Sequence, residues 1–306
     1  MTKNNTKNKI LGPVMLLITA IIWGCAFVAQ SEAMDHMEPF TFQTARSVLG
    51  GVVLLPVIAA SDAIKKKNGI YKRPTKREKR RTLLYGSLCG IVLFAATMFQ
   101  QFGMSLGTSS GKAGFITALY ILLVPVVGLF FKKKVRPVLW GCIALALAGL
   151  YLLCIKDGFT FALSDGLVLC CAVVFTGHII IVDRFAPGLD GVRLSCVQFF
   201  AGAVVSAVFM FIFEKPALSQ LASGWISVAY AGIMSSGVAY TLQILGQQRT
   251  DPTVASMLMS FESVFAVLGG IVIQHQMPTS KEWIGCALMF VAIIAAQLPE
   301  RKKAAI

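Results

Sequence analysis

Long apolar stretches recur ten times along this chain, and short polar or charged segments separate them. They lie near residues 11–31, 40–60, 83–103, 113–131, 138–155, 165–183, 193–213, 224–246, 253–273 and 282–298. About 20 apolar residues in a helix cross the hydrocarbon core of a bilayer, where no water satisfies the backbone. The pattern therefore predicts an all-α polytopic membrane protein with ten transmembrane helices and almost no soluble domain.

Composition and charge refine this prediction. The chain is 56% hydrophobic, has a mean hydropathy of +0.74 and carries a net charge of +14. A net positive charge of this size is typical of proteins that bind nucleic acid, and the basic loop Lys65–Arg81 could bind RNA. If the N-terminus is cytoplasmic, however, 23 of the 28 Lys and Arg residues fall in inner segments and only 4 in outer loops. The positive-inside rule then favours a multi-pass protein of the cell membrane with both termini cytoplasmic, the basic loop on anionic lipid and no nucleic acid partner.

Candidate enzyme chemistry is absent from the sequence pattern. The eight cysteines form no CxxC or Cys/His cluster, and no phosphate-binding loop or nucleophile with a base is recognisable. We therefore expect no enzyme activity, no cofactor and no metal. The alternative to a transporter is a nontransporting membrane protein, either a channel or a membrane-embedded, lipid-modifying enzyme.

The two halves of the chain align with each other. An offset of 152 residues places Trp23 on Phe175 and Arg46 on Gln198, and an offset of 142 places Gly90 on Gly232 and Gln101 on Gln243. Because each half has five spans, an odd number, the second half enters the membrane from the opposite side. Two inverted five-helix repeats suit a transporter that exchanges inward-open and outward-open shapes around a midplane site.

Several short motifs resemble a known family. They are Trp23-Gly24-Cys25-Ala26-Phe27, Ser164-Asp165, Phe261-Glu262-Ser263-Val264-Phe265 and Lys281-Glu282-Trp283-Ile284-Gly285. The chain is similar to the EamA family of the drug/metabolite transporter superfamily over two repeats, 10–155 and 163–298, although Ser263 stands where many relatives have proline. The resemblance implies ten helices and secondary transport. It also implies export of amino acids, metabolites or drug-like compounds through a cavity lined by helices one to four and six to nine.

Two charged residues within the spans are the first candidate site residues. Glu262 lies near the bilayer midplane, where an unpaired carboxylate costs several kcal/mol. We interpret it as a site for substrate or a coupling proton, with interhelical hydrogen bonding as the alternative. Arg46 could bind a substrate carboxylate or pair with Glu262, but it could also snorkel to the outer interface.

Polar residues at helical spacing add further candidates for substrate binding. The third span carries Thr97, Gln101, Ser105 and Thr108 on one face, and the eighth carries Ser236, Tyr240, Gln243 and Gln247. We expect a hydrated cavity between them, with helix–helix hydrogen bonding as the alternative. Gln198 is a weaker candidate on the same reasoning.

Aromatic residues and one histidine complete the set of candidates. Trp23, Phe99, Tyr120 and Tyr240 could form an aromatic wall for an apolar substrate, although aromatic residues in such a chain more often pack. His178 shares its helical face with apolar residues, which favours a packed neutral histidine over a proton relay.

Overall fold

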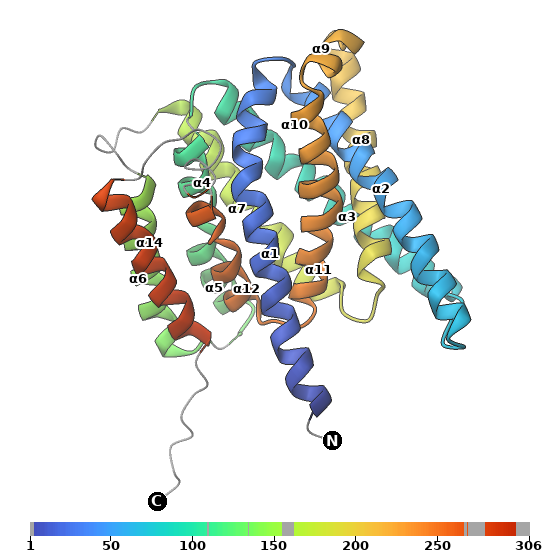
Figure 1. The fold of residues 1–306 in the computed structure, drawn as a ribbon, viewed down its shortest axis with the longest axis horizontal. Coiled ribbons are helices and arrows are strands. Elements are labelled where there is room, and N and C mark those ends of the chain that lie inside the picture. Colours follow the sequence, from blue (N-terminus) through green and yellow to red (C-terminus); the bar gives the residue numbers. More distant parts are fainter. Residues whose placement is uncertain are drawn as a thin grey trace, which may run out of the picture.

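A computed structural model describes residues 3–108, 110–133, 135–154, 162–265, 268 and 279–297. These residues form an all-helical bundle without strands (Figure 1). Seven segments are long and apolar enough to cross a membrane: Ile10–Met34, Pro39–Lys67, Lys76–Ser105, Lys112–Phe130, Leu163–Phe185, Gly191–Phe213 and Trp225–Gln247. Two further apolar helices in the described part are shorter, so the ten-helix count stays a prediction.

The helices follow one another in this order: α1 (Lys3–Met34), α2 (Pro39–Lys67), α3 (Lys76–Ser105), α4 (Ser110–Thr117), α5 (Tyr120–Phe130), α6 (Pro137–Cys154), α7 (Leu163–Phe185), α8 (Gly191–Phe213), α9 (Leu218–Ser223), α10 (Trp225–Ala229), the π-helix η1 (Tyr230–Ala239), α11 (Tyr240–Gln247), α12 (Pro252–Met259) and α14 (Ser280–Gln297). The segments α10, η1 and α11 follow one another without a break and correspond to the predicted eighth span.

Local sequence signals determine where several helices begin. Thr75 and Glu78 form a capping box at the start of α3, where the Thr75 Oγ1 accepts from the Glu78 amide at 3.2 Å. The Asp190 carboxylate caps α8 by accepting from the Val192 and Arg193 amides, both at 3.1 Å. These polar caps satisfy amides that the helices cannot pair internally.

Two predicted spans are interrupted in the structure. The fourth is divided at Ala118 and Leu119, between α4 and α5. The ninth is broken at Ser260 and Phe261, and most of its second part lies outside the described residues. Ala118 and Ser260 are 142 residues apart, which is the offset that relates the two halves in the sequence.

The antiparallel pair of α2 and α8 lies on one side of the bundle, and α6 pairs with α14 at the opposite edge (Figure 1). Gly149 of α6 allows this second pair to approach closely, since a Cβ there would lie 2.7 Å from the Gly285 carbonyl oxygen. The long helix α1 runs between these two edges and contacts α4, η1, α11 and α12. It therefore lies where the first and second halves of the chain meet.

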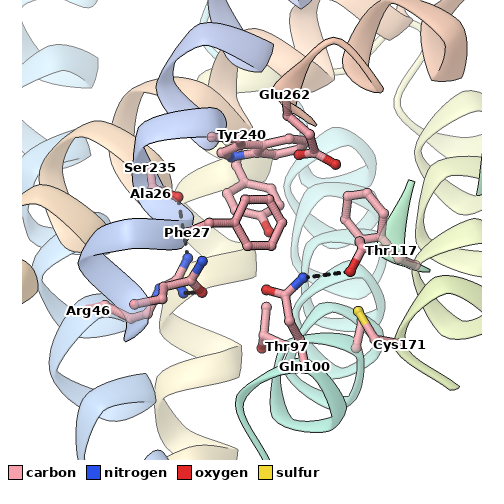
Figure 2. A pocket seen from close by; sticks show the side chains of 14 residues that line it. Ala26, Phe27, Arg46, Thr97, Gln100, Thr117, Cys171, Ser235, Tyr240 and Glu262 are labelled. Atoms are coloured by element: carbon pink, nitrogen blue, oxygen red, sulfur yellow. Dashed lines mark hydrogen bonds between the residues drawn. The ribbon is translucent and has the colours of Figure 1, made fainter. Parts of the chain in front are cut away.

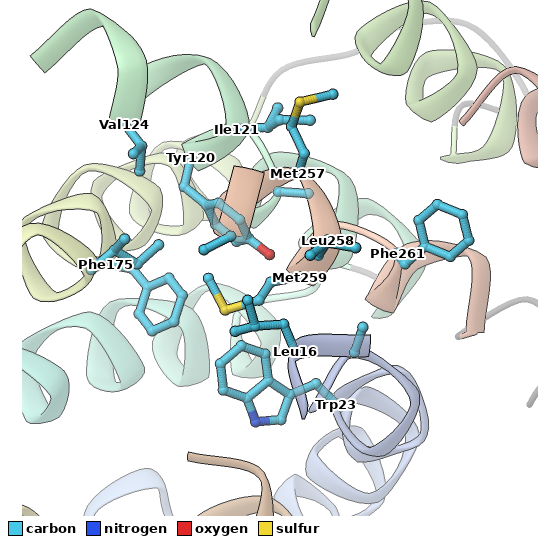
Figure 3. Packing of buried hydrophobic residues seen from close by; sticks show 14 of the residues in the cluster. Leu16, Trp23, Tyr120, Ile121, Val124, Phe175, Met257, Leu258, Met259 and Phe261 are labelled. Atoms are coloured by element: carbon cyan, nitrogen blue, oxygen red, sulfur yellow. The ribbon is translucent and has the colours of Figure 1, made fainter. Parts of the chain in front are cut away.

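The core and the outer surface are both apolar. Figure 3 shows Tyr120, Ile121, Leu16, Met257 and Met259 packed together, and all five are fully buried. Large apolar side chains are also exposed around the outside of the bundle, including Val52, Leu55, Val204, Val208, Phe290, Val291 and Ile294. An exposed apolar belt of this kind is typical of a surface that faces lipid.

Ion pairs lie at the end of the bundle that carries the basic loop. Lys65 pairs with Asp190 at 3.3 Å, and Arg193 pairs with Asp62. At the other end, Lys112 pairs with Asp165 at 2.6 Å. The loops before α3 and before α8, which the charge pattern assigns to one side of the membrane, therefore do lie together at one end of the bundle.

Candidate functional site

A narrow pocket lies in the middle of the bundle (Figure 2). The free space in it is about 30 Å³, enough for a few water molecules and too small for an organic substrate. A substrate can therefore enter only after the helices move. The residues that line the pocket come from both halves of the chain: Trp23, Ala26, Phe27, Gln30, Arg46, Ala96, Thr97, Gln100, Thr117, Cys171, Phe175, Ser235, Tyr240 and Glu262.

Arg46 of α2 forms one wall of the pocket. Its Nη1 donates to Gln30 Oε1 at 2.7 Å, and its Nη2 and Nε donate to the hydroxyls of Ser235 and Ser236, both at 3.4 Å. Only 3% of the residue is exposed, so Arg46 does not snorkel to the interface. All three acceptors are neutral.

The charge of Arg46 is left without a counter-ion among the described residues. No carboxylate there forms an ion pair with it, and its aromatic contact is the Phe42 ring, whose centroid lies 5.6 Å from the guanidinium carbon. A guanidinium has five N–H donors, of which the hydrogen bonds above use three. Because burial of an unpaired charge is costly, this wall favours an anionic group.

Glu262 reaches the same pocket from the segment that follows the break after α12 (Figure 2). It is 3% exposed, and the Tyr120 hydroxyl donates to its Oε1 at 3.2 Å. The sequence left open whether Glu262 pairs with Arg46, and in this structure the two side chains have different partners. The pocket therefore contains one buried acid and one buried base that do not neutralise each other directly.

Residues that the sequence alignment of the two halves pairs with each other are in contact at this site. Trp23 and Phe175, which are 152 residues apart, make an edge-to-face contact with ring centroids 5.8 Å apart. Tyr120 and Glu262, which are 142 residues apart, form the hydrogen bond described above. If a two-fold axis relates the two halves, as the sequence predicts, such contacts are expected near that axis, where positions meet their own counterparts.

Aromatic rings supply the apolar surface of the pocket. The Trp23 and Tyr240 rings lie 4.6 Å apart, and Phe27 and Phe175 also line the space. The buried indole N–H of Trp23 has no hydrogen-bond partner among the described residues. It is therefore a donor that a bound molecule could use.

The structure brings only some of the predicted site residues together. Glu262, Arg46, Tyr240 and Trp23 line the pocket, whereas Gln101, Gln243, Gln198 and His178 do not. The Gln101 amide donates to the Met34 sulfur at 3.3 Å, and the Gln198 Oε1 lies 2.9 Å from the His178 Nε2. The side chain of Gln243 is buried, and neither of its polar atoms has a partner among the described residues.

Several lining residues were missed in the sequence, namely Gln30, Gln100, Thr117 and Ser235. The Gln100 amide donates to the Thr117 hydroxyl at 3.0 Å within the pocket. A signal existed for Gln30, because Trp23, Phe27 and Gln30 share a helical face. Gln100 and Gln101 are adjacent in sequence, and only packing decides which of the two faces the pocket.

The π-helix η1 explains why Ser235 was missed. A π-helix forms i→i+5 hydrogen bonds and often occurs at functional sites, whereas the predicted polar face assumed a regular α-helix through the eighth span. In the structure, both Ser235 and Ser236 of η1 reach Arg46. No group of three or more metal-ligating side chains occurs in the described ranges.

Comparison with known proteins identifies the family of this chain. The EamA-like transporter family model matches residues 10–155 and 163–296. The chain belongs to this family. It is therefore a multi-pass membrane transporter, and the sequence-based resemblance to EamA proteins is confirmed.

Relatives of this EamA protein carry the same general description. It is 28% identical over 289 residues to an uncharacterized transporter of Archaeoglobus fulgidus, covering 92% of this chain and 84% of that one. It is 24% identical to the uncharacterized transporter YwfM of Bacillus subtilis, covering 95% of each chain. It is 22% identical to the uncharacterized inner membrane transporter YedA of Escherichia coli K12, covering 91% of this chain and 88% of that one.

A solved structure titled "Crystal structure of protein" shares the fold. It superimposes with a TM-score of 0.73 at 22% sequence identity, covering 95% of this chain and 96% of that chain. At this identity, the likeness describes the fold alone.

Proposed function

We propose that this EamA protein is a secondary transporter that exports small organic molecules by alternating access. The observation that carries the proposal is the central pocket, where Arg46 and Glu262 are buried without pairing and to which both halves of the chain contribute lining residues. Charges buried in a membrane protein are seldom retained without a role in moving substrate or ions. The narrowness of the pocket suits an occluded state between inward-open and outward-open shapes.

The proposed architecture is ten helices in two inverted repeats, 10–155 and 163–298. Its support is the pair of helix breaks 142 residues apart and the two contacts between equivalent residues, Trp23 with Phe175 and Tyr120 with Glu262. Inverted halves provide the two exchangeable shapes that alternating access needs.

Each wall of the pocket has a proposed role in binding. The guanidinium of Arg46 binds a carboxylate of the substrate, and Trp23 and Tyr240 contact its apolar part. Glu262 binds a coupling proton or a cationic group of the substrate, with the Tyr120 hydroxyl as its hydrogen-bond partner. Gln101, Gln243, Gln198 and His178 line the pathway once the helices separate.

We further propose that the protein resides in the cell membrane with both termini cytoplasmic. The support is the clustering of Lys and Arg in segments that share one end of the bundle. Export as the direction follows from family resemblance.

Metabolite profiling tests the proposal. Cells that overexpress the protein should accumulate one or a few carboxylate-containing compounds in the medium, relative to cells with an empty vector. Glu262→Gln keeps the shape of the side chain but fixes a neutral state, so it should insert normally and lose export or its pH dependence. Glu262→Asp keeps the carboxylate and should retain partial export.

Two results would count against this function. If overexpressing cells and empty-vector cells release the same compounds into the medium in the same amounts, the proposed export activity is contradicted. A Glu262→Gln variant that transports like wild type from about pH 5.5 to 8 would reduce Glu262 to a helix-packing role, since no titratable group would then be needed there. A channel would instead give sustained currents in planar bilayers, whereas a transporter gives saturable flux with counter-transport.

A further inference from the structure

Helix α2 begins and α8 ends at the end of the bundle opposite the chain termini (Figure 1). A second cavity lies between these two helix ends. Its volume is about 470 Å³, within the usual range for small-molecule sites, and it shares no lining residue with the central pocket. It is lined by Glu38, Pro39, Phe40, Phe102, Phe209, Phe213 and Glu214, which we call the phenylalanine groove.

The walls of the phenylalanine groove are aromatic rings from three helices. Phe40 stacks on Phe209 with centroids 5.4 Å apart, and Phe102 meets it edge-on at 5.3 Å. Phe213 also stacks on Phe40, at 6.2 Å, but is still 68% exposed. The rings therefore form an ordered apolar surface that opens to the outside of the bundle.

The two carboxylates of the groove, Glu214 and Glu38, differ in their hydrogen bonds and in how far their charge is compensated. Glu214 accepts from the Phe40 and Thr41 amides at 2.7 and 2.6 Å and from the Thr41 hydroxyl at 2.7 Å. These donors belong to the first turn of α2, so the Glu214 charge is compensated by that helix end. Glu214 is therefore a structural link between α8 and α2.

The charge of Glu38 is not compensated in this way. Its side chain is exposed, makes no capping hydrogen bond to α2, and forms no ion pair in the part of the chain that the structure describes. A free carboxylate beside stacked phenyl rings attracts an amphiphilic cation, because aromatic faces also stabilise positive charge. An anionic amphiphile would be repelled by the uncompensated charge of Glu38.

We propose that the phenylalanine groove binds a phospholipid whose headgroup ends in a primary ammonium. The groove lies where the candidate spans α2 and α3 meet the end of α8, and the ends of such spans are where lipid headgroups are expected. The ammonium pairs with Glu38, and the glycerol and upper acyl segments lie on Phe209 and Phe213. This lipid site is independent of the substrate of the central pocket.

Lipid binding by the purified full chain tests the proposal. We expect native mass spectrometry after incubation with dioleoyl phosphatidylethanolamine to show a retained lipid, and dioleoyl phosphatidylglycerol to be retained several-fold less. Phe213→Ala and Glu38→Gln should each lower the apparent affinity for phosphatidylethanolamine about fivefold, the size of one partly exposed apolar contact for Phe213 and of one exposed ionic contact for Glu38. Both side chains are exposed, so the variants should keep the wild-type unfolding temperature.

Two matched variants serve as controls. Phe211→Ala removes a side chain of α8 that is 73% exposed outside the groove, and Asp35→Asn removes a carboxylate that lies nearby in the sequence and does not line the groove. Both should retain phosphatidylethanolamine like wild type. The proposal is overturned if phosphatidylglycerol binds equally well, if both groove variants bind like wild type, or if the controls lose as much lipid as the groove variants.

Discussion

At the scale of single residues, the most unusual group is the guanidinium of Arg46. It is buried in the membrane part of the protein, and its hydrogen bonds go to one amide and two hydroxyls. Neutral acceptors orient the side chain without cancelling its charge. Under the proposed function, this fixed orientation would lower the cost of ordering the side chain when a carboxylate binds.

Arg46→Gln should therefore weaken binding of a carboxylate substrate. Loss of a charge-assisted contact of about 1.5–3 kcal/mol corresponds to a roughly 10- to 100-fold rise in KM. Arg46→Lys should fall between wild type and Gln, because an ammonium keeps the charge but lacks the planar fork that holds Gln30 and both serines and leaves N–H groups over for a substrate. Concentration-dependent transport in membrane vesicles measures these values.

The control for Arg46 is Arg249→Gln, which removes an exposed arginine whose Nη1 donates to the Leu245 carbonyl, away from the central pocket. Its KM should equal that of wild type. An unchanged KM in Arg46→Gln, with normal protein level, would show that Arg46 orients helices and does not contact substrate.

At the scale of helices, close approach depends on small residues. A Cβ at Gly90 of α3 would lie 2.3 Å from the backbone carbonyl oxygen of Gln198 in α8. Backbone cannot rotate away as a side chain can, so the two helices would have to separate. Small residues at such crossings are typical of membrane helices.

Gly90→Ala should lower stability by about 1–3 kcal/mol, the usual cost of overpacking. Gly177→Ala is the matched control, because no atom of a neighbouring helix lies within 4 Å of a Cβ at that position of α7. Alanine there should leave the unfolding temperature unchanged or slightly higher, as alanine favours helix. Thermal unfolding of the purified variants in detergent makes the comparison, and equal unfolding temperatures for the two variants would contradict the packing seen between α3 and α8.

At the scale of the whole molecule, charge distribution predicts the orientation in the membrane. In a cysteine-less background, a cysteine at position 36 should react with a membrane-impermeant thiol reagent added outside intact cells. A cysteine at position 70, in the basic loop, should react only after permeabilisation. Both native residues, His36 and Ile70, are exposed; the first lies just before α2 and the second just after it, and α2 runs from one end of the bundle to the other (Figure 1).

The control for this experiment is a cysteine at position 204. Val204 is 66% exposed in the middle of α8, on the apolar belt, so a hydrophilic reagent should not reach it in either preparation. The reverse pattern at positions 36 and 70 would refute the ten-span topology.

The sequence alone determined the class of this protein and its most informative side chains. Runs of apolar residues require helices in a bilayer, and charges are so costly there that Glu262 and Arg46 were recognisable as candidates without a structure. Trp23 and Tyr240 were also identified. Motifs spread over the whole chain were enough to indicate the EamA family.

Only the tertiary structure decided which side of each helix faces the pocket. In a membrane protein, the surfaces toward lipid and toward other helices are both apolar, so the hydrophobic pattern does not determine helix rotation. Packing turned Gln100 toward the pocket and Gln101 toward Met34, and the π-helix brought Ser235 to Arg46. The phenylalanine groove likewise exists because α2, α3 and α8, which are separate segments of the sequence, meet at one end of the bundle.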